Sequence, residues 1–373
     1  MRILYVEPHD GGSHAGFGRV LQREITAQWT AITLPARHWK WHMRAVAAHA
    51  RLAHAEALAR GFDLVLASSY TPLAELVGLV PALAHVPRVL YFHENQLDFP
   101  TRTPEHAERD LHYGVTQLVS ALAADVCAFN SAHNRDSFLA AARALLSRMP
   151  FAPPGWVEAI AARAQVLPVP IDLPDVAPTL APPDAHARAA GPILLWNHRW
   201  EFDKDPDGFL AALRQLDRDG ERFRVVICGQ RFARVPESLA SAPSWLGARL
   251  LHHGYAEDRD AYLGWLDRAD VVVSTALHEF YGVAVLEAVH RGAAPIVPDR
   301  LSYPEVLPAA PRYRDAAGLV AALRQACRDH AQGLMLRADR RAWTRPLLTA
   351  AVVPRFAALF ERVIAAQPAR LRM

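Results

Sequence analysis

Short apolar runs alternate with amphipathic helical stretches along the chain. Each run is almost uniformly apolar instead of alternating apolar and polar residues, which is typical of strands covered by helices on both faces. The pattern therefore predicts a parallel α/β domain in the first half of the chain. The predicted strands there are RILYV (2–6), DLVLAS (63–68), RVLYF (88–92) and DVCAFN (125–130).

A proline-rich segment separates this pattern from a second one. Residues 174–192, PDVAPTLAPPDAHARAAGP, disfavour both helix and internal strand, so we predict an interdomain linker there. The alternation then resumes and predicts a second parallel α/β domain. Its predicted strands are PILLWN (192–197), FRVVICG (223–229), ARLLHHG (248–254), DVVVST (270–275) and APIVPD (294–299).

We place the N-terminal domain at 1–185 and the C-terminal domain at 186–351. The remaining segment, 352–373, begins with the helical sequence VVPRFAALFERVIAAQ. It is predicted either to close the second domain or to pack back on the first. The halves show no sequence repeat of fixed period, so we expect them to share an architecture and not a sequence.

Composition narrows the class of protein. A length of 373 residues and a hydrophobic content of 51% suffice for two cores, and a net charge of +3 permits an anionic partner without demanding a surface that coats nucleic acid. The three cysteines, Cys127, Cys228 and Cys327, lie far apart, so neither a disulfide framework nor a thiolate metal site is indicated. With no signal-peptide core and no apolar window long enough to span a bilayer, we expect a cytoplasmic protein without a membrane partner.

Polar stretches follow four of the predicted strands, and open parallel sheets bind ligands beyond the carboxyl ends of their strands. The first stretch is EPHDGGSHAGFG, residues 7–18. Gly11 and Gly12 allow a tight loop whose backbone N–H groups can approach an anion, and a helix is predicted to follow. An ordinary turn is the alternative.

The second stretch is YFHENQLDFP, residues 91–100, where a predicted strand ends in His93, Glu94, Asn95 and Gln96. Four hydrogen-bonding side chains would be costly to bury without partners, so an exposed ligand site is predicted. The alternative is a loop that caps the next helix, which Asn95 alone would explain.

The third stretch is LLWNHRWEFDKDP, residues 194–206. Arg199 and Lys204 are predicted to converge on one diphosphate, the guanidinium as a fork and the ammonium as a point charge. The alternative is a solvated loop in which both cations pair with the neighbouring acids. We interpret DKD, residues 203–205, as a helix start and not as a D-x-D metal motif, because a lysine separates the acids and a proline follows.

The fourth stretch is HEFYGVAVLEAVHRGAAPIV, residues 278–297. A turn containing Gly282 followed by a helix puts Glu279 in the loop and Glu287 on the helix. One carboxylate is predicted to engage sugar hydroxyls and the other the two hydroxyls of a ribose. Backbone N–H groups near Gly282 and Val283 are predicted to point at phosphate. The alternative for Glu287 is an ordinary surface acid.

The stretch RHWKWHMR, residues 37–44, interleaves cations with aromatic side chains. This mixture is expected of a surface that stacks on unpaired bases and neutralises phosphates. The alternative is that the tryptophans anchor a loop to the core. The residues concerned are Arg37, Trp39, Lys40, Trp41 and Arg44.

The E-x7-E pair, Arg199 followed by Lys204, the Gly11-Gly12 loop and His93 together resemble the retaining GT-B glycosyltransferases of the family 4 type. More narrowly, the chain is similar to the queuosine-tRNA mannosyltransferase family in the blocks DGGSHAGF, RHWKWHMR, YFHENQLDFP, WNHRWEFDKDP and HEFYGVAVLEAV. That family moves mannose from GDP-mannose onto the cyclopentenediol of queuosine in the anticodon of tRNA-Asp. Where many members of the superfamily carry an N-G-(I/V)-D loop, this chain reads LPVPID (167–172), so the backbone contact attributed to that loop is not carried over.

The resemblance implies an α/β protein with the GT-B fold, two Rossmann-like parallel-sheet domains facing each other across a cleft. It implies transfer of a hexose with retention, GDP-mannose as donor and tRNA as acceptor, with no cofactor and no metal. The catalytic residues that it implies are His93, Arg199, Lys204 and Glu279. The implied donor-binding residues are Gly11, Gly12, Arg199, Lys204, Gly229, Glu279, Phe280, Tyr281, Gly282, Val283 and Glu287. The implied acceptor-binding residues are Ser13, His14, Arg37, Trp39, Lys40, Trp41, Arg44, Glu94, Asn95 and Gln96.

Two other functions stay open on the sequence. The same donor site could serve a glycan, lipid or small-molecule acceptor, although the helical stretch 44–61 has few large apolar residues, which disfavours docking on a membrane. An RNA-binding protein with a degenerate sugar site is the other alternative. The presence of Arg199, Lys204, Glu279 and Glu287 together argues against lost catalysis. No sequence feature indicates an oligomeric state.

Overall fold

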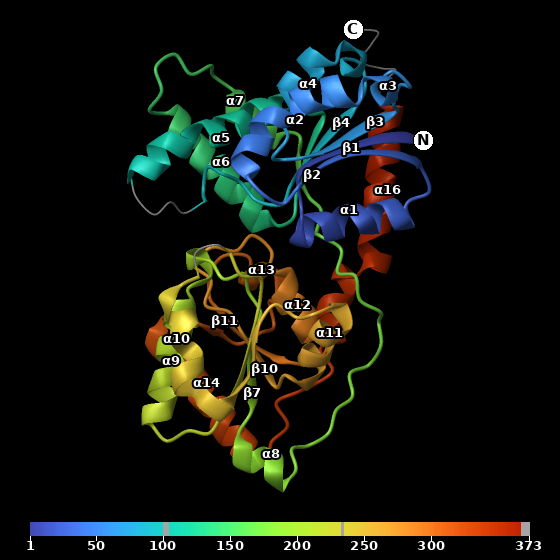
Figure 1. Ribbon diagram of the computed structural model, residues 1–373. Helices are drawn as coiled ribbons and strands as arrows, with labels where there is room; N and C mark the ends of the chain where they lie inside the picture. The colour runs from blue at the N-terminus through green and yellow to red at the C-terminus, as the bar shows by residue number, and fades with distance from the viewer. Residues whose placement is uncertain (100–103, 233–234, 367–373) are drawn as a thin grey trace. The chain divides into compact units, whose positions relative to one another are not determined.

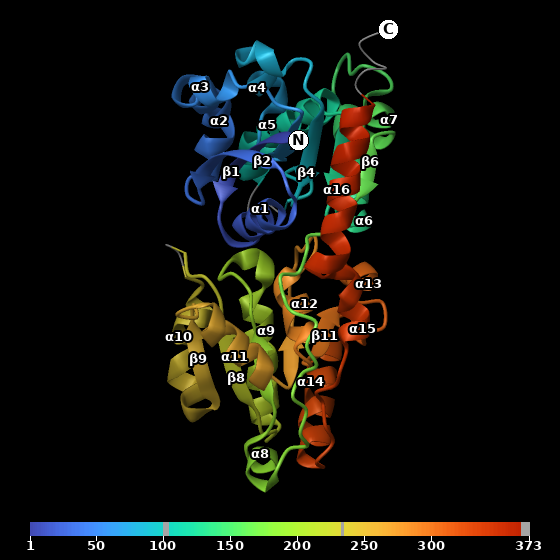
Figure 2. The same ribbon diagram turned by 90° about the vertical axis from the view of Figure 1, so that its right-hand side faces the viewer.

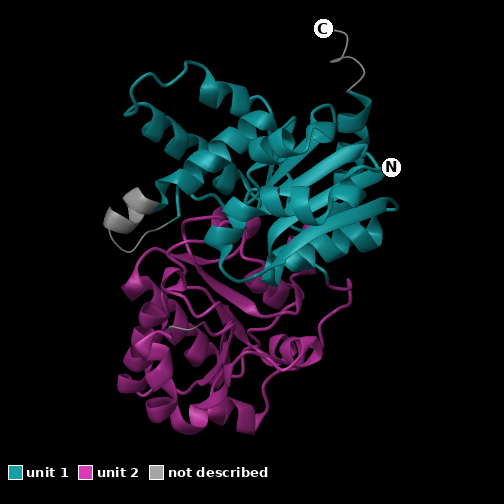
Figure 3. Cartoon of the chain, turned by 45° about the horizontal axis from the view of Figure 1, so that its top comes forward, with its two compact units in different colours: residues 1–172, 349–373 teal, residues 173–348 magenta. Residues whose placement is uncertain are grey.

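The computed structural model describes residues 1–99, 104–232 and 235–366. It divides into two compact units (Figure 3): unit 1 comprises Met1–Asp172 and the chain from Thr349 onward, and unit 2 comprises Leu173–Leu348. The boundary lies before the predicted linker instead of at 185/186. The end of the predicted C-terminal segment, residues 367–373, lies outside the described residues, as does the last residue of YFHENQLDFP, Pro100.

Unit 1 is built on a six-stranded parallel sheet with the order β2-β1-β3-β4-β5-β6 (Figure 1). Its strands are β1 (Arg2–Asp10), β2 (Gln28–Pro35), β3 (Leu64–Ser68), β4 (Arg88–Phe92), β5 (Val126–Phe129) and β6 (Ala164–Val166). The four strands predicted for this half are all present. Sequence reasoning missed β2, which is only partly buried at the sheet edge, and β6, whose three residues carry too little pattern.

Helices cover both faces of this sheet, as near-uniformly apolar strands require. On one face Phe17 and Phe356 pack against Tyr91, with ring centroids 4.3 and 5.6 Å from it. These two residues belong to α1 and α16, which lie side by side (Figure 2). The other face packs against α2, α4, α5, α6 and α7. The helices are α1 (Gly12–Glu24), α2 (Trp39–Ala53), α3 (Ala55–Leu58), α4 (Leu73–Leu79), α5 (Pro104–Ala123), α6 (Ala132–Leu146), α7 (Trp156–Ala161) and α16 (Thr349–Ala365).

The predicted C-terminal helix is therefore found on unit 1. Of the two placements that the sequence leaves open, the structure has the one in which this segment packs back on the first half of the chain. Its apolar side chains, Phe356 among them, are buried there.

Unit 2 has the same architecture, with the strand order β12-β11-β10-β7-β8-β9. Its strands are β7 (Ile193–Trp196), β8 (Arg224–Cys228), β9 (Leu250–Gly254), β10 (Val271–Val273), β11 (Ala294–Pro298) and β12 (Arg312–Tyr313). The five predicted strands are present, and only the two-residue β12 was missed. Along β7 the side chains alternate between two buried faces, because Trp196 packs toward α9, α10 and α14 while α11 and α12 cover the other side.

In unit 2, helices follow the strands and are joined to them by loops. The helices are α8 (Ala185–Ala190), α9 (Pro206–Arg218), α10 (Glu237–Leu246), α11 (Arg259–Arg268), α12 (Val283–His290), α13 (Tyr303–Val306), α14 (Ala316–Ala331) and α15 (Arg341–Thr344). None of the helices that the structure describes in either unit is long and apolar enough to cross a bilayer.

The predicted linker, 174–192, contains the short helix α8, so the expectation that no helix forms there was wrong. The prolines of the segment lie on either side of α8 and not within it. The carboxylate of Asp184 caps this helix by accepting from the N–H of Ala187 at 2.7 Å. A capped, proline-free stretch was therefore hidden by the composition of its flanks.

Each sheet has one point at which the strand order reverses direction. In unit 1 this point lies between β1 and β3, and in unit 2 between β7 and β10. The loops that leave the carboxyl ends of such strands diverge to opposite faces and form a crevice for ligands. Most of the predicted site residues follow β1, β4, β7 and β10, at or next to these two points, whereas Gly229 follows β8 and residues 37–44 follow β2.

Candidate functional site

A buried ion cluster lies at the carboxyl end of the unit 2 sheet, around Lys204. The Nζ atom of Lys204 donates to the carbonyl of His278 at 2.7 Å and lies 3.3 Å from Glu279 Oε2 and 3.2 Å from Asp203 Oδ2. Lys204 is 6% exposed and Asp203 is 1% exposed. The cluster therefore places one ammonium among two carboxylates, shielded from water.

The pKa values in this cluster follow from burial and charge together. Burial alone would lower the pKa of Lys204, but the charges of Glu279 and Asp203 outweigh it and raise that pKa, although nearby Arg199 opposes them. Burial would raise the pKa of Glu279, but Lys204 overrides it and lowers the value to about 2. Burial, reinforced by Lys204, lowers the pKa of His198 to about 4. At neutral pH Lys204 is thus a cation, Glu279 an anion and His198 a neutral imidazole.

The local sequence explains how Lys204 comes to be buried. Asp203 and Lys204 end a single 3₁₀ turn, and Asp205 then caps α9 by accepting from the N–H of Gly208 at 3.0 Å. Pro206 occupies the first position of that helix, where its missing N–H is tolerated. The interpretation of DKD as a helix start is confirmed, and the alternative of a solvated loop is wrong for Asp203 and Lys204.

Arg199 behaves differently from Lys204. Its side chain is 43% exposed and its Nε lies 3.3 Å from Glu201. The solvated ion pair of the alternative reading therefore describes Arg199. Because Arg199 lies close enough to lower the pKa of Lys204, the two cations are neighbours, as a shared diphosphate site requires. Diphosphate binding itself stays a prediction.

Glu279 and the helix α12 meet at a tight turn. Gly282 is the N-cap of α12. Its φ of 89° is a backbone conformation that residues other than glycine rarely adopt. The N–H of Tyr281 donates to Glu279 Oε1 at 3.3 Å, and no side chain among the described residues caps the helix. The predicted turn and helix are confirmed. Uncapped N–H groups, with the positive end of the helix dipole, form a suitable site for phosphate.

Glu287 has partners of its own. Its Oε1 accepts from Arg259 at 2.6 Å and its Oε2 accepts from the hydroxyl of Tyr262 at 2.9 Å. Asn197, which follows β7, donates to the Tyr262 hydroxyl and to the carbonyl of Ala284. Glu287 is 7% exposed, so the surface-acid alternative is wrong. The two glutamates of E-x7-E therefore form ion pairs with two different cations, Glu279 with Lys204 and Glu287 with Arg259.

Gly229 follows β8 and lies against the backbone of the loop that follows β7. A Cβ atom at this position would lie 1.8 Å from the carbonyl oxygen of His198, so only glycine fits. The structure thereby explains the glycine by packing between two strand-end loops. A contact from Gly229 to a donor stays a prediction.

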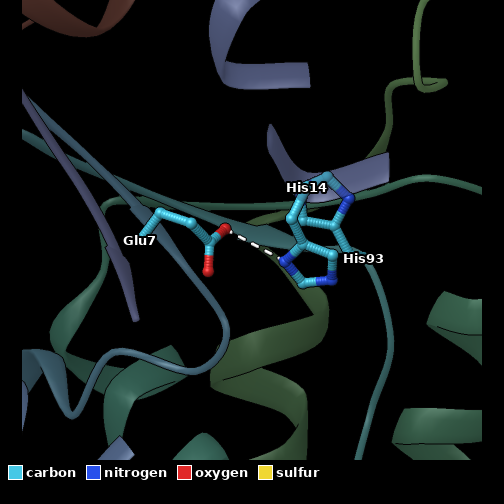
Figure 4. Close-up of side chains that lie close together, drawn as sticks. All are labelled: Glu7, His14 and His93. Carbon is cyan, nitrogen blue, oxygen red and sulfur yellow. Dashed lines mark hydrogen bonds and ion pairs between the residues drawn. The ribbon is translucent and has the colours of Figure 1, made fainter. Parts of the chain in front are cut away.

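A second buried cluster, which contains Glu7, His14 and His93, lies in unit 1, at the end of β1 (Figure 4). Glu7 is fully buried, and its Oε1 accepts from the Ser68 hydroxyl at 3.0 Å and from the N–H of His9 at 2.9 Å. Its Oε2 lies 3.0 Å from Nδ1 of His14, in the first turn of α1. Because Ser68 ends β3, the carboxylate joins the two strands at the topological switch point.

His93 completes this cluster from the end of β4. Its ring stacks on that of His14, with centroids 4.0 Å apart and an angle of 27° between the planes. Nε2 of His93 is buried and has no hydrogen-bond partner within the described part of the chain. Burial lowers the pKa of His93 well below its ordinary value, and the two nearby histidines lower it further. His93 is therefore neutral at physiological pH.

The glycine loop joins β1 to α1. Gly11 is the N-cap of α1 and lies against Ala36, while Gly12 and Ser13 are exposed. The predicted helix after the loop is confirmed, and no side chain in the described residues caps it. Anion binding by this loop stays a prediction.

The residues after His93 divide into structural and accessible ones. The buried side chain of Asn95 donates to Asn134 Oδ1 at 3.0 Å and accepts from the N–H of Asp98 at 2.9 Å, so it holds its own loop against α6 and does not face outward to a ligand. The alternative that Asn95 caps the next helix stays a prediction. Glu94 and Gln96 are half-buried, and Gln96 donates to the hydroxyl of Tyr70 at 3.4 Å. Their role in acceptor binding stays a prediction.

The stretch RHWKWHMR forms the start of α2, and its two tryptophans differ. Trp39 stacks on Tyr70 with centroids 5.3 Å apart and belongs to a small core cluster. Trp41 is 66% exposed. Arg37 and Arg44 are exposed as well, whereas Lys40 is ion-paired with Asp110. The anchoring alternative holds for Trp39, and Trp41 stays available to a ligand.

Sequence reasoning gave no site role to several polar residues that organise both clusters, most of them buried. Glu7 carried a signal, because an acid interrupts an apolar strand beside a glycine loop. Arg259 and Tyr262 carried none, because they lie on an ordinary amphipathic helix. The residues missed are Glu7, His9, Ser68, Tyr70, Asn197, His198, Asp203, Arg259, Tyr262 and His278.

Comparison with known proteins assigns a family to each half of the chain. Residues 2–171 match the family described as tRNA-queuosine alpha-mannosyltransferase N-terminal, and residues 184–322 match glycosyl transferases group 1. The tRNA-queuosine alpha-mannosyltransferase of Drosophila melanogaster is 37% identical over 341 residues, which cover 87% of each chain.

Solved structures show the fold. Sucrose-phosphate synthase from Thermosynechococcus elongatus matches with a TM-score of 0.71 and 16% identity, over 98% of this chain and 100% of that one. The Anabaena protein HepE, in complex with UDP and glucose, matches with a TM-score of 0.68 and 15% identity, over 97% and 99% of the two chains. The prediction of a GT-B fold with two Rossmann-like units is confirmed.

Proposed function

Because this chain belongs to the tRNA-queuosine alpha-mannosyltransferase family, we propose that it transfers mannose from GDP-mannose to queuosine in the anticodon of tRNA-Asp, with retention at the anomeric carbon. The observation that carries the proposal is the buried Lys204–Glu279 ion pair beside the uncapped start of α12. The pair combines a cation for a leaving diphosphate with an anion for the sugar. The protein is proposed to act in the cytoplasm, where tRNA is modified.

The transition state separates a positively charged sugar from a negatively charged diphosphate. Arg199, Lys204 and the first N–H groups of α12 are proposed to neutralise the diphosphate as it leaves. Glu279, ionised at neutral pH, is proposed to hold the sugar hydroxyls and to stabilise the positive charge on the ring. These groups supply the charge stabilisation at the diphosphate without a metal or cofactor there.

Glu287 is proposed to bind the ribose of the donor nucleotide. Its carboxylate is fixed by Arg259 and Tyr262 and is buried within unit 2. A carboxylate with free lone pairs can accept from both hydroxyls of a ribose while these partners keep it in place. The nearby residues Phe280, Tyr281 and Val283 shape the turn around the nucleotide.

The acceptor is proposed to bind unit 1. Trp41 and Arg44 on α2, with Arg37 just before this helix, are exposed. They offer one stacking surface and two cations for an unpaired anticodon loop. His93 is proposed to meet the reacting hydroxyl, with Ser13, Glu94 and Gln96 at its margin. The exposed surface around the start of α2 supports RNA over a lipid acceptor, because it combines charge with an aromatic plane.

The test is a transfer assay with radiolabelled GDP-mannose and tRNA from cells that contain or lack queuosine. Label is expected only in the queuosine-containing tRNA, and Glu279→Gln is expected to lose it because the carboxylate is replaced by a neutral group of the same shape. Gel-shift binding of the same tRNA by the variant is the matched control. Hydrolysis of GDP-mannose without transfer to either tRNA would refute the acceptor, and tRNA binding without hydrolysis or transfer would favour an RNA-binding protein.

A further inference from the structure

The Glu7–His14–His93 cluster gathers three potential metal ligands from three separate elements. Glu7 comes from β1, His14 from α1 and His93 from the end of β4. Their exposed fractions are 0, 7 and 7%, so the three side chains converge inside the protein (Figure 4). Burying two imidazoles and a carboxylate together costs free energy, because each polar group loses its hydration there and needs a partner to offset the loss.

The charge of the cluster is incomplete. Glu7 is a fully buried carboxylate, and within the described residues its ion-pairing partner is His14 and not an arginine or lysine. A buried carboxylate needs positive charge nearby to offset lost hydration. His14 supplies a full charge only when protonated. A bound divalent cation would supply this positive charge next to the carboxylate.

The geometry suits a cation. One ligand atom from each residue lies within 4.8 Å of the others, and Glu7 Oε2 is 3.0 Å from His14 Nδ1. Ligands at about 2.0–2.2 Å from tetrahedral zinc lie about 3.3 Å from one another. The cation would replace the proton that now joins Oε2 to Nδ1. The His93 ring, which stacks on that of His14, would turn out of this stack to direct a nitrogen at the ion.

The surroundings orient the ligands as metal sites require. Ser68 and the N–H of His9 hold Oε1 of Glu7, which leaves Oε2 directed at His14. Tyr70 stacks on the opposite side of the His14 ring, with centroids 5.6 Å apart. Contacts of this kind fix the orientation of metal ligands in known sites. The buried Nε2 of His93 has no hydrogen-bond partner in the described chain, so this nitrogen is available to bind a ligand.

We propose that Glu7, His14 and His93 bind one divalent cation of the zinc class. Two nitrogens and one carboxylate oxygen leave a fourth position of a tetrahedral ion open to an oxygen ligand. In the absence of substrate this ligand is water. Resting on the proposed function, the same position accepts the hydroxyl of the acceptor, so His93 reaches that hydroxyl through the ion.

The test measures metal content and does not use tRNA or donor, so its failure leaves the proposed transfer standing. Full-length protein purified without chelator and dialysed against metal-free buffer is expected to retain about one zinc-class ion per chain. Glu7→Gln and His93→Gln are expected to lose it. His54→Gln is the matched control, because Nε2 of His54 lies 3.3 Å from Nε2 of His49 and the pair is a possible source of adventitious binding.

Cobalt provides the second measurement. Stripped protein reconstituted with Co²⁺ is expected to show the intense visible absorption of a four-coordinate ion, absent from Glu7→Gln and kept in His54→Gln. Far-UV circular dichroism confirms that each variant is folded. A folded wild-type protein that retains no ion and gives no cobalt spectrum would overturn the proposal. So would an ion that is lost from His54→Gln and kept by Glu7→Gln.

Discussion

Replacement of Lys204 by methionine removes the cation that touches both acids of the buried unit 2 cluster. The substitution keeps an unbranched side chain, one atom shorter. It leaves Asp203, 1% exposed, and Glu279 without this counter-ion, and it leaves the carbonyl of His278 without its 2.7 Å donor. Removing one partner of a buried pair costs about 3–5 kcal/mol. We expect a loss in this range for the free energy of unfolding of unit 2 at pH 7.

The pKa values give an independent magnitude. A carboxyl whose pKa is lowered to about 2 in the folded state contributes about 3 kcal/mol at neutral pH, present above its unfolded pKa and lost as the pH falls toward 2. In Lys204→Met this contribution disappears, and burial raises the pKa of Glu279 instead. The stability difference between wild type and variant should therefore be largest near neutral pH and should shrink in acid.

The assay is urea unfolding at several pH values, followed by tryptophan fluorescence. The chain has one other lysine, Lys40, whose ion pair with Asp110 is more exposed. Lys40→Met is thus a matched control with an expected loss of about 0–1 kcal/mol. Combining Lys204→Met with Asp203→Asn should recover part of the loss, because one uncompensated charge is removed. Equal losses for Lys204→Met and Lys40→Met would refute the buried-pair argument.

Three further predictions concern the two units. Gly229→Ala should destabilise unit 2 by about 2–4 kcal/mol in thermal unfolding, because its Cβ would lie 1.8 Å from the His198 carbonyl; an unchanged midpoint would contradict this close approach. Trp41→Ala should weaken tRNA binding by about 1–3 kcal/mol in filter-binding assays, with Arg362→Ala on α16 as control; equal effects would place the RNA elsewhere. The pKa of His198 is about 4 and that of Glu279 about 2, so neither group changes its charge between about pH 5 and 8. The rate of slow GDP-mannose hydrolysis should therefore be nearly constant in that range and fall below about pH 4, whereas a midpoint near 6.5 would implicate another group.

The strands could be predicted because parallel sheets bury both faces of each strand. Runs such as RVLYF are apolar throughout, and β4 spans the same residues, Arg88–Phe92. Edge strands escape this rule. In β2 most positions are half-buried or exposed, so its pattern resembles that of a loop with scattered apolar residues. The helix α8 was missed for a related reason, because composition was averaged over flanking prolines.

The sequence predicted where the candidate site residues lie in the fold, but not which side chains they contact. Parallel strands direct their carboxyl ends to one edge, so polar residues that follow strands are brought together. Which of them pair depends on helices that carry no such signal. Arg259 and Tyr262 reach Glu287 from α11, and nothing in their spacing distinguishes them from surface residues. Asn95 illustrates the converse, because a promising polar residue at a strand end proved to hold its own loop together.

The choice of lysine at position 204 follows from the shape of its site. The chain relies on arginine for nearly all of its cations, yet the buried cluster contains an ammonium. An ammonium has three donors arranged around one atom, and Lys204 meets three oxygens, from His278, Glu279 and Asp203. A planar guanidinium presents its donors as a fork and would need a wider space than a side chain only 6% exposed allows. The ammonium therefore fixes both carboxylates from a single point. Its proposed action on a diphosphate is through its charge, and the more exposed Arg199 is proposed to bind the diphosphate as a fork.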